Sequence, residues 1–275
     1  MFQAAVSRLT ALRVLPLLFV IVGPVLVTGC ADSGKDVYIE RPVEQLYNIA
    51  MDDLQDESYT KAAKEFDEVE RQHPYSVWAS KAQLMAAYAH YQHNKFDDAI
   101  TALDRFIQLH PSHKDVAYAF YLKAICYYEQ IADVERDQKS TEESLKALQE
   151  VVDRFPTSRY ARDAKLKLDL TRDHLAGKEM AIGRYYESGR MYLAAINRYR
   201  HVIDNYQTTT HVPEALERLS ECYTALGLTF EAQKMASILG YNYPGNEWYA
   251  DSYTLVEGKD AIGAKKDTGW FNWLW

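Results

Sequence analysis

The sequence predicts an all-helical protein: a right-handed superhelical solenoid of five helix pairs, with about ten helices in total. Three observations support this fold class, namely few helix-breaking residues, apolar residues at helical spacing, and a pattern that repeats along the chain. The 275 residues include only 12 glycines and 8 prolines, and residues 43–176 contain no glycine. A β-sandwich or a doubly wound α/β protein would need more turn residues than this sequence offers.

The balance of charges argues against a nucleic-acid partner. The chain has 31 lysine and arginine residues against 39 aspartate and glutamate residues, which gives a net charge of −8. Binding to nucleic acid depends on clustered cations that displace counterions from the phosphates. We therefore expect no nucleic acid among the partners of this chain.

Residues 1–29 have the pattern of a bacterial signal peptide. Arg8 and Arg13 supply the positive charge, and an uncharged run of 14 residues follows from Val14 to Val27. A membrane-spanning helix needs about 20 apolar residues, whereas this run is shorter and is interrupted by proline and glycine. We therefore predict that the segment is removed from the mature protein.

The signal ends in Val-Thr-Gly-Cys at residues 27–30, which resembles the lipobox of bacterial lipoproteins. In that family a peptidase cuts before the cysteine, which then carries a diacylglycerol and an N-acyl chain. The resemblance implies lipid attachment at Cys30, at the start of an N-terminal tether over residues 30–41. Because Ala31 stands where aspartate would retain a lipoprotein at the inner membrane, the periplasmic face of the outer membrane is expected. The alternative is an ordinary secretory signal with an unmodified cysteine.

Residues 42–250 contain a pattern that occurs five times. Each copy has a small residue in a first helix, a turn, a second small residue and, in most copies, a large apolar residue and a closing proline. In the first copy these are Ala50, Ala62, Phe66 and Pro74, and the second copy repeats them 37 residues later. The pattern resembles the tetratricopeptide repeat, in which two antiparallel helices approach closely at small residues.

Insertions modify the third and fourth copies. The third is eight residues longer, and its spacing places the extra residues in a charged turn within Ala132–Ser140. The fourth has fourteen extra residues, close to four helical turns of 3.6 residues each. Its first helix is therefore predicted to be unusually long, from about Ser158 to Ser188, with Gly177 as its weakest point.

Residues 251–275 are predicted as a polar linker and an aromatic C-terminal tail. The tail ends in Gly-Trp-Phe-Asn-Trp-Leu-Trp at residues 269–275. Tryptophans are costly to leave in water, because each can bury on the order of 200 Å². Our hypothesis is that they dock on a partner or at the membrane interface; the alternative is that they fold back onto the end of the solenoid.

The remaining cysteines, Cys126 and Cys222, occupy equivalent positions two repeats apart. Two packing steps of 8–10 Å separate such positions by about 16–20 Å. A disulfide requires Cα atoms within about 7 Å. We therefore predict two buried free thiols rather than a disulfide.

The sequence contains no recognisable catalytic pattern. It lacks a zinc-protease helix, a glycine-rich phosphate loop and a nucleophile elbow. His90 with His93, and His110 with His113, are spaced closely enough to share a metal, but neither pair has an obvious third ligand nearby. We interpret them as surface residues and predict a binding protein that is not an enzyme, with no cofactor beyond the lipid at Cys30.

The predicted concave surface is rich in tyrosine. In tetratricopeptide proteins four positions of each first helix line this surface, and in the first three repeats half of them are tyrosine: Tyr47, Tyr88, Tyr91, Tyr118, Tyr121 and Tyr128. The same positions in the fifth repeat are polar, with three glutamates. Rings with hydroxyl tips suit an extended strand of alternating apolar and polar residues. The alternative is that these tyrosines pack against neighbouring helices.

Several segments resemble the BamD (ComL) family of outer-membrane assembly lipoproteins. Besides Cys30, they are residues 45–50, 66–75, 154–160 and 185–199, and the resemblance extends to about Tyr253. It implies a scaffold subunit of the β-barrel assembly (BAM) machine whose first repeats receive unfolded outer-membrane proteins. The last repeats would dock on the POTRA domains of BamA, alongside other BAM lipoproteins. A repeat lipoprotein that scaffolds cell-wall enzymes is the alternative function.

The lipid attachment site is tested by Cys30→Ser. We expect this variant to remain uncleaved or to become a soluble periplasmic protein, because serine lacks the thiol that accepts the lipid. Fractionation followed by immunoblotting measures the change. Retention in the outer membrane after a salt wash, in cells without its partners, would contradict the assignment.

Overall fold

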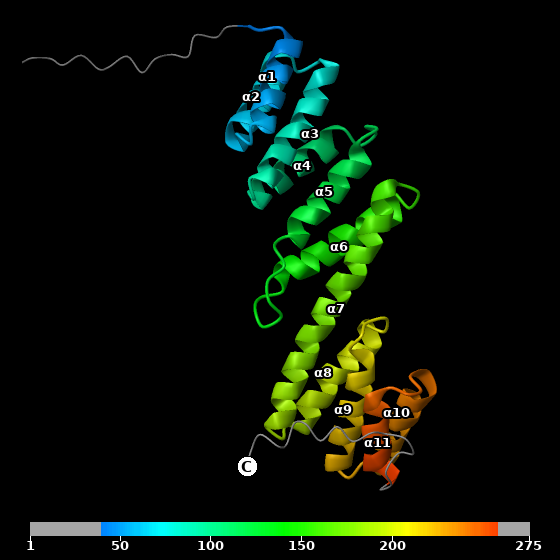
Figure 1. The fold of residues 1–275 in the computed structure, drawn as a ribbon. Coiled ribbons are helices and arrows are strands. Elements are labelled where there is room, and N and C mark those ends of the chain that lie inside the picture. The colour runs from blue at the N-terminus through cyan, green and yellow to red at the C-terminus, as the bar shows by residue number, and fades with distance from the viewer. Residues whose placement is uncertain (1–39, 258–275) are drawn as a thin grey trace, which may run out of the picture. The chain divides into compact units, whose positions relative to one another are not determined.

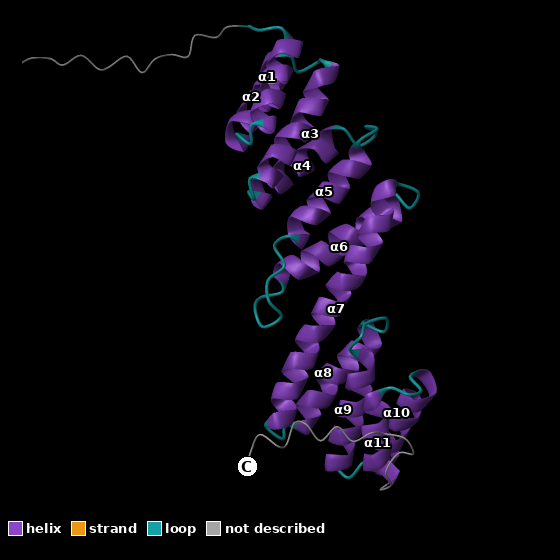
Figure 2. Ribbon diagram, in the orientation of Figure 1, coloured by secondary structure: helices purple, strands orange, loops and turns teal. Residues whose placement is uncertain are grey.

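The computed structural model describes residues 40–257, which form eleven α-helices and contain no strand (Figures 1 and 2). The predicted signal peptide, Cys30, most of the tether and the aromatic tail lie outside the described residues. The helices are α1 (Val43–Gln55), α2 (Tyr59–Gln72), α3 (Val77–Gln92), α4 (Phe96–Leu109), α5 (Val116–Tyr128), α6 (Lys139–Arg154), α7 (Arg159–Ser188), α8 (Tyr192–Asn205), α9 (Val212–Ala225), α10 (Thr229–Asn242) and α11 (Glu247–Glu257).

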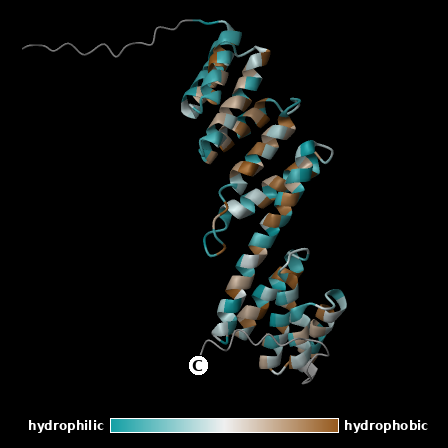
Figure 3. Cartoon of the chain, in the orientation of Figure 1, coloured by the Kyte–Doolittle hydropathy of each residue, from teal (hydrophilic) through white to brown (hydrophobic). Residues whose placement is uncertain are grey.

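The helices stack in chain order, as a solenoid of the tetratricopeptide type requires. Each helix packs against the next one along the chain, and the first helices of successive pairs, α1, α3, α5 and α7, also contact one another in turn. Apolar and polar stretches alternate along the helices (Figure 3), as expected for amphipathic helices that bury one face. The predicted all-helical solenoid of five helix pairs is therefore confirmed.

A small residue and its partner define the crossing inside each helix pair. The small residue lies on the first helix and its partner lies on the second, and all ten side chains or Cα positions are buried. At the fourth crossing the small residue is a glycine, and the ring of its tyrosine partner lies directly against it. The pairs are Ala50–Phe66, Ala87–Leu103, Ala124–Leu148, Gly183–Tyr199 and Ser220–Ala236.

Four of the five turns between paired helices share one backbone conformation. Glu57, Asn94, Arg190 and Gly227 have φ values of 59°, 58°, 57° and 74°, in the left-handed region. The next amide donates to the carbonyl five residues earlier, as Met191 does to Tyr186 at 2.8 Å. This hydrogen bond satisfies a carbonyl at the end of the first helix and reverses the chain. The third pair differs because its inserted residues lengthen the turn between α5 and α6.

Helix α7 confirms the predicted insertion in the fourth repeat. It spans 30 residues without a break, and the side chain of Ser158 accepts a hydrogen bond from the amide of Ala161 at its start. Gly177 lies inside the helix and is buried, so the helix continues through the position predicted to be weakest. The inserted residues of the third repeat fall between Tyr128 and Lys139, where the turn was predicted.

Helix α11 is absent from the prediction of ten helices. It crosses the predicted end of the repeat domain at residue 250, and it packs against α9 and α10. The ring of Tyr249 lies so close to α10 that a Cβ atom on Gly240 would be 2.4 Å from its Cε2 atom. The eleven residues of α11 do not repeat the small-residue pattern, so the comparison of copies could not detect this helix.

Cys126 and Cys222 are buried free thiols, as predicted. Burial raises the pKa of Cys126 to about 12, so this thiol stays protonated at neutral pH.

Within residues 40–257, no helix is both long enough and apolar enough to cross a membrane.

Two glycines of α7 provide a matched test of the crossing between α7 and α8. A Cβ atom on Gly183 would lie 2.3 Å from Cε1 of the buried Tyr199 ring. On Gly177 it would lie 3.2 Å from Nε2 at the tip of the His211 side chain and 3.6 Å, an ordinary contact distance, from Cγ1 of Val134. We expect Gly183→Ala to lower the free energy of unfolding by about 1–3 kcal/mol, because the ring has no space to move.

Gly177→Ala should leave that free energy unchanged or raise it by up to about 1 kcal/mol, because alanine favours the helix. Urea unfolding of both variants, in a chain that also carries Cys30→Ser, measures the difference. Equal effects of the two substitutions would contradict the proposed close approach.

Candidate functional site

The six predicted tyrosines lie on the first helices of the first three pairs, α1, α3 and α5, and all are half-buried. Four of them form a set together with a fifth tyrosine, which lies on α7. We call this set the tyrosine cluster, and its members are Tyr88, Tyr91, Tyr118, Tyr121 and Tyr160. The cluster therefore extends over three consecutive first helices.

Ring contacts connect the tyrosine cluster from α5 to α7. Tyr160 stacks on Tyr121, with ring centroids 5.1 Å apart, and contacts Tyr118 at 5.5 Å. On α3, Tyr88 and Tyr91 face each other at 6.3 Å. The tyrosines of α3 and α7 also lie close enough to Tyr118 to add to the effect of burial on its pKa, which is raised. The hydroxyl of Tyr118 consequently stays protonated at neutral pH and can donate a hydrogen bond.

Three hydroxyls of the cluster already have partners within the chain. Tyr121 donates to Oδ2 of Asp163 on α7 at 2.6 Å, and Tyr88 accepts a hydrogen bond from the side-chain amide of Gln92. Tyr160 accepts a hydrogen bond from the guanidinium of Arg159 at 2.6 Å. Burial and the hydrogen bond to Asp163 both raise the pKa of Tyr121. Tyr121 thus joins α5 to α7, in agreement with the alternative that some of these tyrosines pack against neighbouring helices.

The other two predicted tyrosines lie apart from the cluster. Tyr47 contacts Phe66 at 5.5 Å and Trp78 at 4.8 Å, inside the apolar core of the first repeat. Tyr128 lies under the amino group of Lys167, which is 4.7 Å from its ring centroid. The structure therefore divides the six tyrosines among three different surroundings.

Tyr160 was missed by the sequence analysis, because concave positions were derived for the first three repeats and the fifth but not for the fourth. A signal for it was present in the sequence. Trp78 and Tyr160 occupy the same place in two Pro-x-Ser-x-aromatic-Ala segments, residues 74–79 and 156–161. In both segments the serine caps the helix, and the aromatic residue packs on a tyrosine of the preceding first helix.

The polar positions predicted for the fifth repeat form an ion cluster around Arg218 of α9. Its guanidinium donates to Glu221 at 2.8 Å and lies 3.6 Å from Glu214 and 3.8 Å from Glu217. Glu187 of α7 approaches Arg218 at 4.0 Å. Trp248 of α11 lies beside the guanidinium, 5.7 Å from ring centroid to Cζ.

Burial changes the acidity of this cluster. Glu217 is only 3% exposed, and burial together with the neighbouring Glu221 raises its pKa to about 9. Burial also raises the pKa of Glu187, although Tyr199 donates a hydrogen bond to its carboxylate at 2.7 Å. Glu217 is therefore protonated at neutral pH, and the prediction of an open polar surface at this position was wrong because the side chain points inward.

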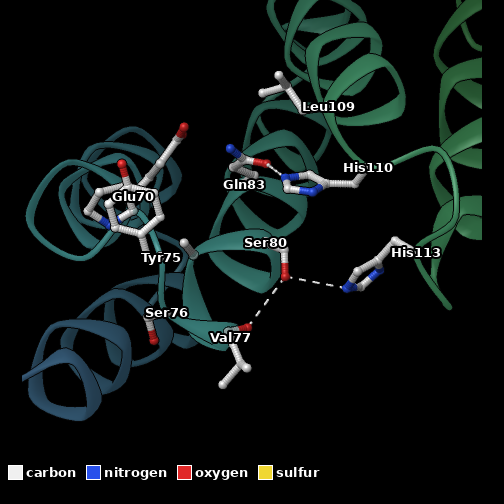
Figure 4. A pocket seen from close by; sticks show the side chains of 11 residues that line it. Glu70, Tyr75, Ser76, Val77, Ser80, Gln83, Leu109, His110 and His113 are labelled. Carbon is white, nitrogen blue, oxygen red and sulfur yellow. Dashed lines mark hydrogen bonds between the residues drawn. The ribbon is translucent and has the colours of Figure 1, made fainter.

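A separate cleft of about 440 Å³ lies between the first two repeats (Figure 4). His110 faces the side-chain oxygen of Gln83 at 2.9 Å, and His113 faces the hydroxyl of Ser80 at 3.3 Å. Both rings are thus hydrogen-bonded to α3. Among the described residues, no group of three or more histidine, cysteine, aspartate or glutamate side chains is arranged to hold a metal ion.

The chain is similar to a family of known proteins. A family model described as "YfiO: Outer membrane lipoprotein" matches residues 39–238. A Caulobacter vibrioides protein named "Outer membrane protein assembly factor BamD" is 53% identical over 233 residues, covering 84% of this chain and 76% of that protein. The chain belongs to the BamD family. The resemblance predicted from the sequence is confirmed.

Other members of the BamD family match over similar lengths. The Rickettsia prowazekii protein of the same name is 48% identical, and the match covers 84% of this chain and 93% of that protein. The protein from Neisseria meningitidis serogroup A is 36% identical, and the match covers 79% of this chain and 87% of that protein. Among solved structures, the P58(IPK) TPR domain is similar at 18% identity and a TM-score of 0.41, covering 78% of this chain and 56% of that chain.

The ion cluster predicts a pH dependence that Glu217→Gln should remove. Between the ordinary carboxyl pKa of about 4.3 and the raised value, the unfolded chain binds fewer protons than the folded chain, so stability falls as pH rises. We expect Glu217→Gln to be more stable than the parent at pH 8, by on the order of 1–3 kcal/mol, and the difference to shrink toward pH 5.

Urea unfolding at pH 5 and pH 8 measures both effects. The matched control is Glu179→Gln, which loses an ion pair with Arg198 of 3.1 Å outside the cluster and should change stability by similar amounts at both pH values. A loss of stability at pH 8 in Glu217→Gln would refute the protonated state.

Proposed function

We propose that this chain is a lipid-anchored scaffold on the periplasmic face of the outer membrane and that it takes part in the assembly of outer-membrane proteins. Membership in the BamD family and the names of its relatives support this role. In the proposal, the tyrosine cluster receives unfolded outer-membrane proteins, and the last two repeats dock on the POTRA domains of BamA near other BAM lipoproteins. The lipid at Cys30 holds the scaffold at the membrane.

The tyrosine cluster is the observation that carries this proposal. Its half-buried rings come from α3, α5 and α7, so one extended segment could contact all three helices. A β-strand places successive side chains about 3.3 Å apart on opposite faces. Rings can contact the apolar side chains of such a strand, while the hydroxyls hydrogen-bond to its backbone. Neither contact demands one fixed sequence, as a receptor for many barrel proteins requires.

The fourth and fifth repeats support a second, separate surface. There, ion pairs replace the tyrosine contacts: Arg218 lies within 4.0 Å of four carboxyl groups, of which Glu217 is the protonated one, and Arg184 pairs with Glu214. Such a network fixes the relative positions of α7 and α9. A rigid pair of helices is suited to a constant partner, whereas the aromatic cluster is suited to variable ones.

Tyr88→Ala combined with Tyr91→Ala tests the receiving site. The double substitution removes two half-buried rings from α3, and we expect it to weaken binding of an unfolded barrel strand by about tenfold or more. The probe is a synthetic peptide of alternating apolar and polar residues that ends in an aromatic residue. Fluorescence anisotropy of the labelled peptide gives the dissociation constant.

The design separates binding from folding. Tyr121 is left intact because it joins α5 to α7, and Tyr241→Ala on α10 is the matched control because this ring is 87% exposed and lies outside the cluster. Tyr88→Phe with Tyr91→Phe should retain most of the affinity. Unchanged peptide binding in the alanine variant, with circular dichroism like that of the parent, would remove the tyrosine cluster from the proposed function.

A further inference from the structure

The last two repeats have an apolar edge that the first three lack. In the turn between the paired helices, two positions are polar in the first three repeats, the residue before the second helix and the second residue of that helix. These residues are Ser58 and Thr60, Lys95 and Asp97, and Gln138 and Ser140. In the fourth and fifth repeats the same positions hold Met191 and Leu193, and Leu228 and Phe230, which we call the apolar edge.

The side chains of the apolar edge face solvent in the described chain. Leu193 is 69% exposed and Phe230 is 74% exposed, while Met191 and Leu228 are nearly half exposed. Leu226, in the same turn as Leu228, is also exposed. Grouped apolar side chains at a surface mark a place where something binds, whereas single exposed apolar residues carry no such meaning.

The connectivity brings the end of the described chain to the same edge. Helices α8 and α10 both begin there, and α11 packs along α10 and α9 after the turn at residues 243–246. Because α11 runs back from that turn, it ends on the side where α10 begins. In Figure 1 the α7–α8 turn, the α9–α10 turn and the end of α11 all lie at the lower end of the drawing.

We infer that the apolar edge is the docking site of this chain's own C-terminal segment, residues 270–275, whose sequence is Trp-Phe-Asn-Trp-Leu-Trp. The segment and the edge have matching chemistry, since five of these six residues are large and apolar. This inference is independent of the proposed function.

The length of the intervening chain suits this docking. Twelve residues, 258–269, separate the end of α11 from Trp270, and as a flexible linker they would span on average about 20 Å. Neighbouring helices lie 8–10 Å apart, so the two turns of the edge are within about 20 Å of the end of α11. A linker whose average span matches this distance gives an effective concentration in the millimolar range, which favours docking within one molecule.

Photo-cross-linking in the full chain with Cys30→Ser tests the inference. The benzophenone amino acid p-benzoylphenylalanine replaces Phe230 or Leu193, and mass spectrometry maps the cross-linked peptide. We expect a cross-link to residues 267–275 within one molecule, at a yield that does not change with protein concentration. The same amino acid at Thr60, which occupies the equivalent position of the first repeat, is the matched control and should give no such cross-link.

A second measurement uses Leu193→Asp combined with Phe230→Asp. Both side chains are exposed, so the helices should fold as in the parent, and circular dichroism checks this. Tryptophan emission should shift to longer wavelength, because the three tail tryptophans become hydrated, and Thr60→Asp should cause no shift.

Three results would overturn the inference. Cross-links to a second copy that increase with concentration would show a dimer surface. Cross-links in membranes to another protein or to lipid, without the tail, would show a partner or membrane site. Unchanged tryptophan emission in the double aspartate variant would show that the tail does not contact the edge.

Discussion

The close approach of two helix axes at one small residue is the constraint on which the rest of this structure depends. At each crossing a buried small residue of the first helix leaves room for the second helix. The tightest example is Gly183, against which the ring of Tyr199 lies. Because small residues recur in every first helix, the helices of each pair can approach closely, and the first helices of successive pairs, α1, α3, α5 and α7, contact one another in turn. The tyrosine cluster exists because this contact places tyrosines of three helices side by side.

The sequence was sufficient to predict the fold because the small–large pattern is local and is repeated. The spacing predicted the insertion between Tyr128 and Lys139 and the length of α7, since both follow from counting residues between equivalent positions. It could not predict α11, which packs against α9 and α10 without repeating the pattern. Nor could it show that Glu217 points into the protein, because the surroundings of that carboxyl come from α7 as well as from its own helix.

Part of the candidate site could also be predicted from the repeated pattern. Counting along the repeats gave four members of the tyrosine cluster, but it gave no positions in the fourth repeat and so missed Tyr160, and Tyr47 and Tyr128 proved to have other neighbours. Ring contacts depend on distances between helices, which sequence spacing does not give.

The tyrosines and the ion cluster differ in how they would respond to a bound segment. Rings can turn and slide over one another at little cost, whereas the ion pairs of Arg218 lose energy when their geometry changes.

Helix α7 belongs to two stacks at once, which affects how the protein unfolds. Its first half packs on α5 and α6, and its second half packs on α8. In most repeat proteins the turn between neighbouring units lets one unit unravel while the next stays intact. Here a turn still separates α6 from α7, but α7 itself is a continuous helix of 30 residues, about 45 Å long, that packs on both stacks. Melting of the third repeat would leave the first half of α7 without its packing surface, and the loss would pass to the fourth repeat along the helix itself. We therefore expect the third and fourth repeats to unfold as one cooperative unit.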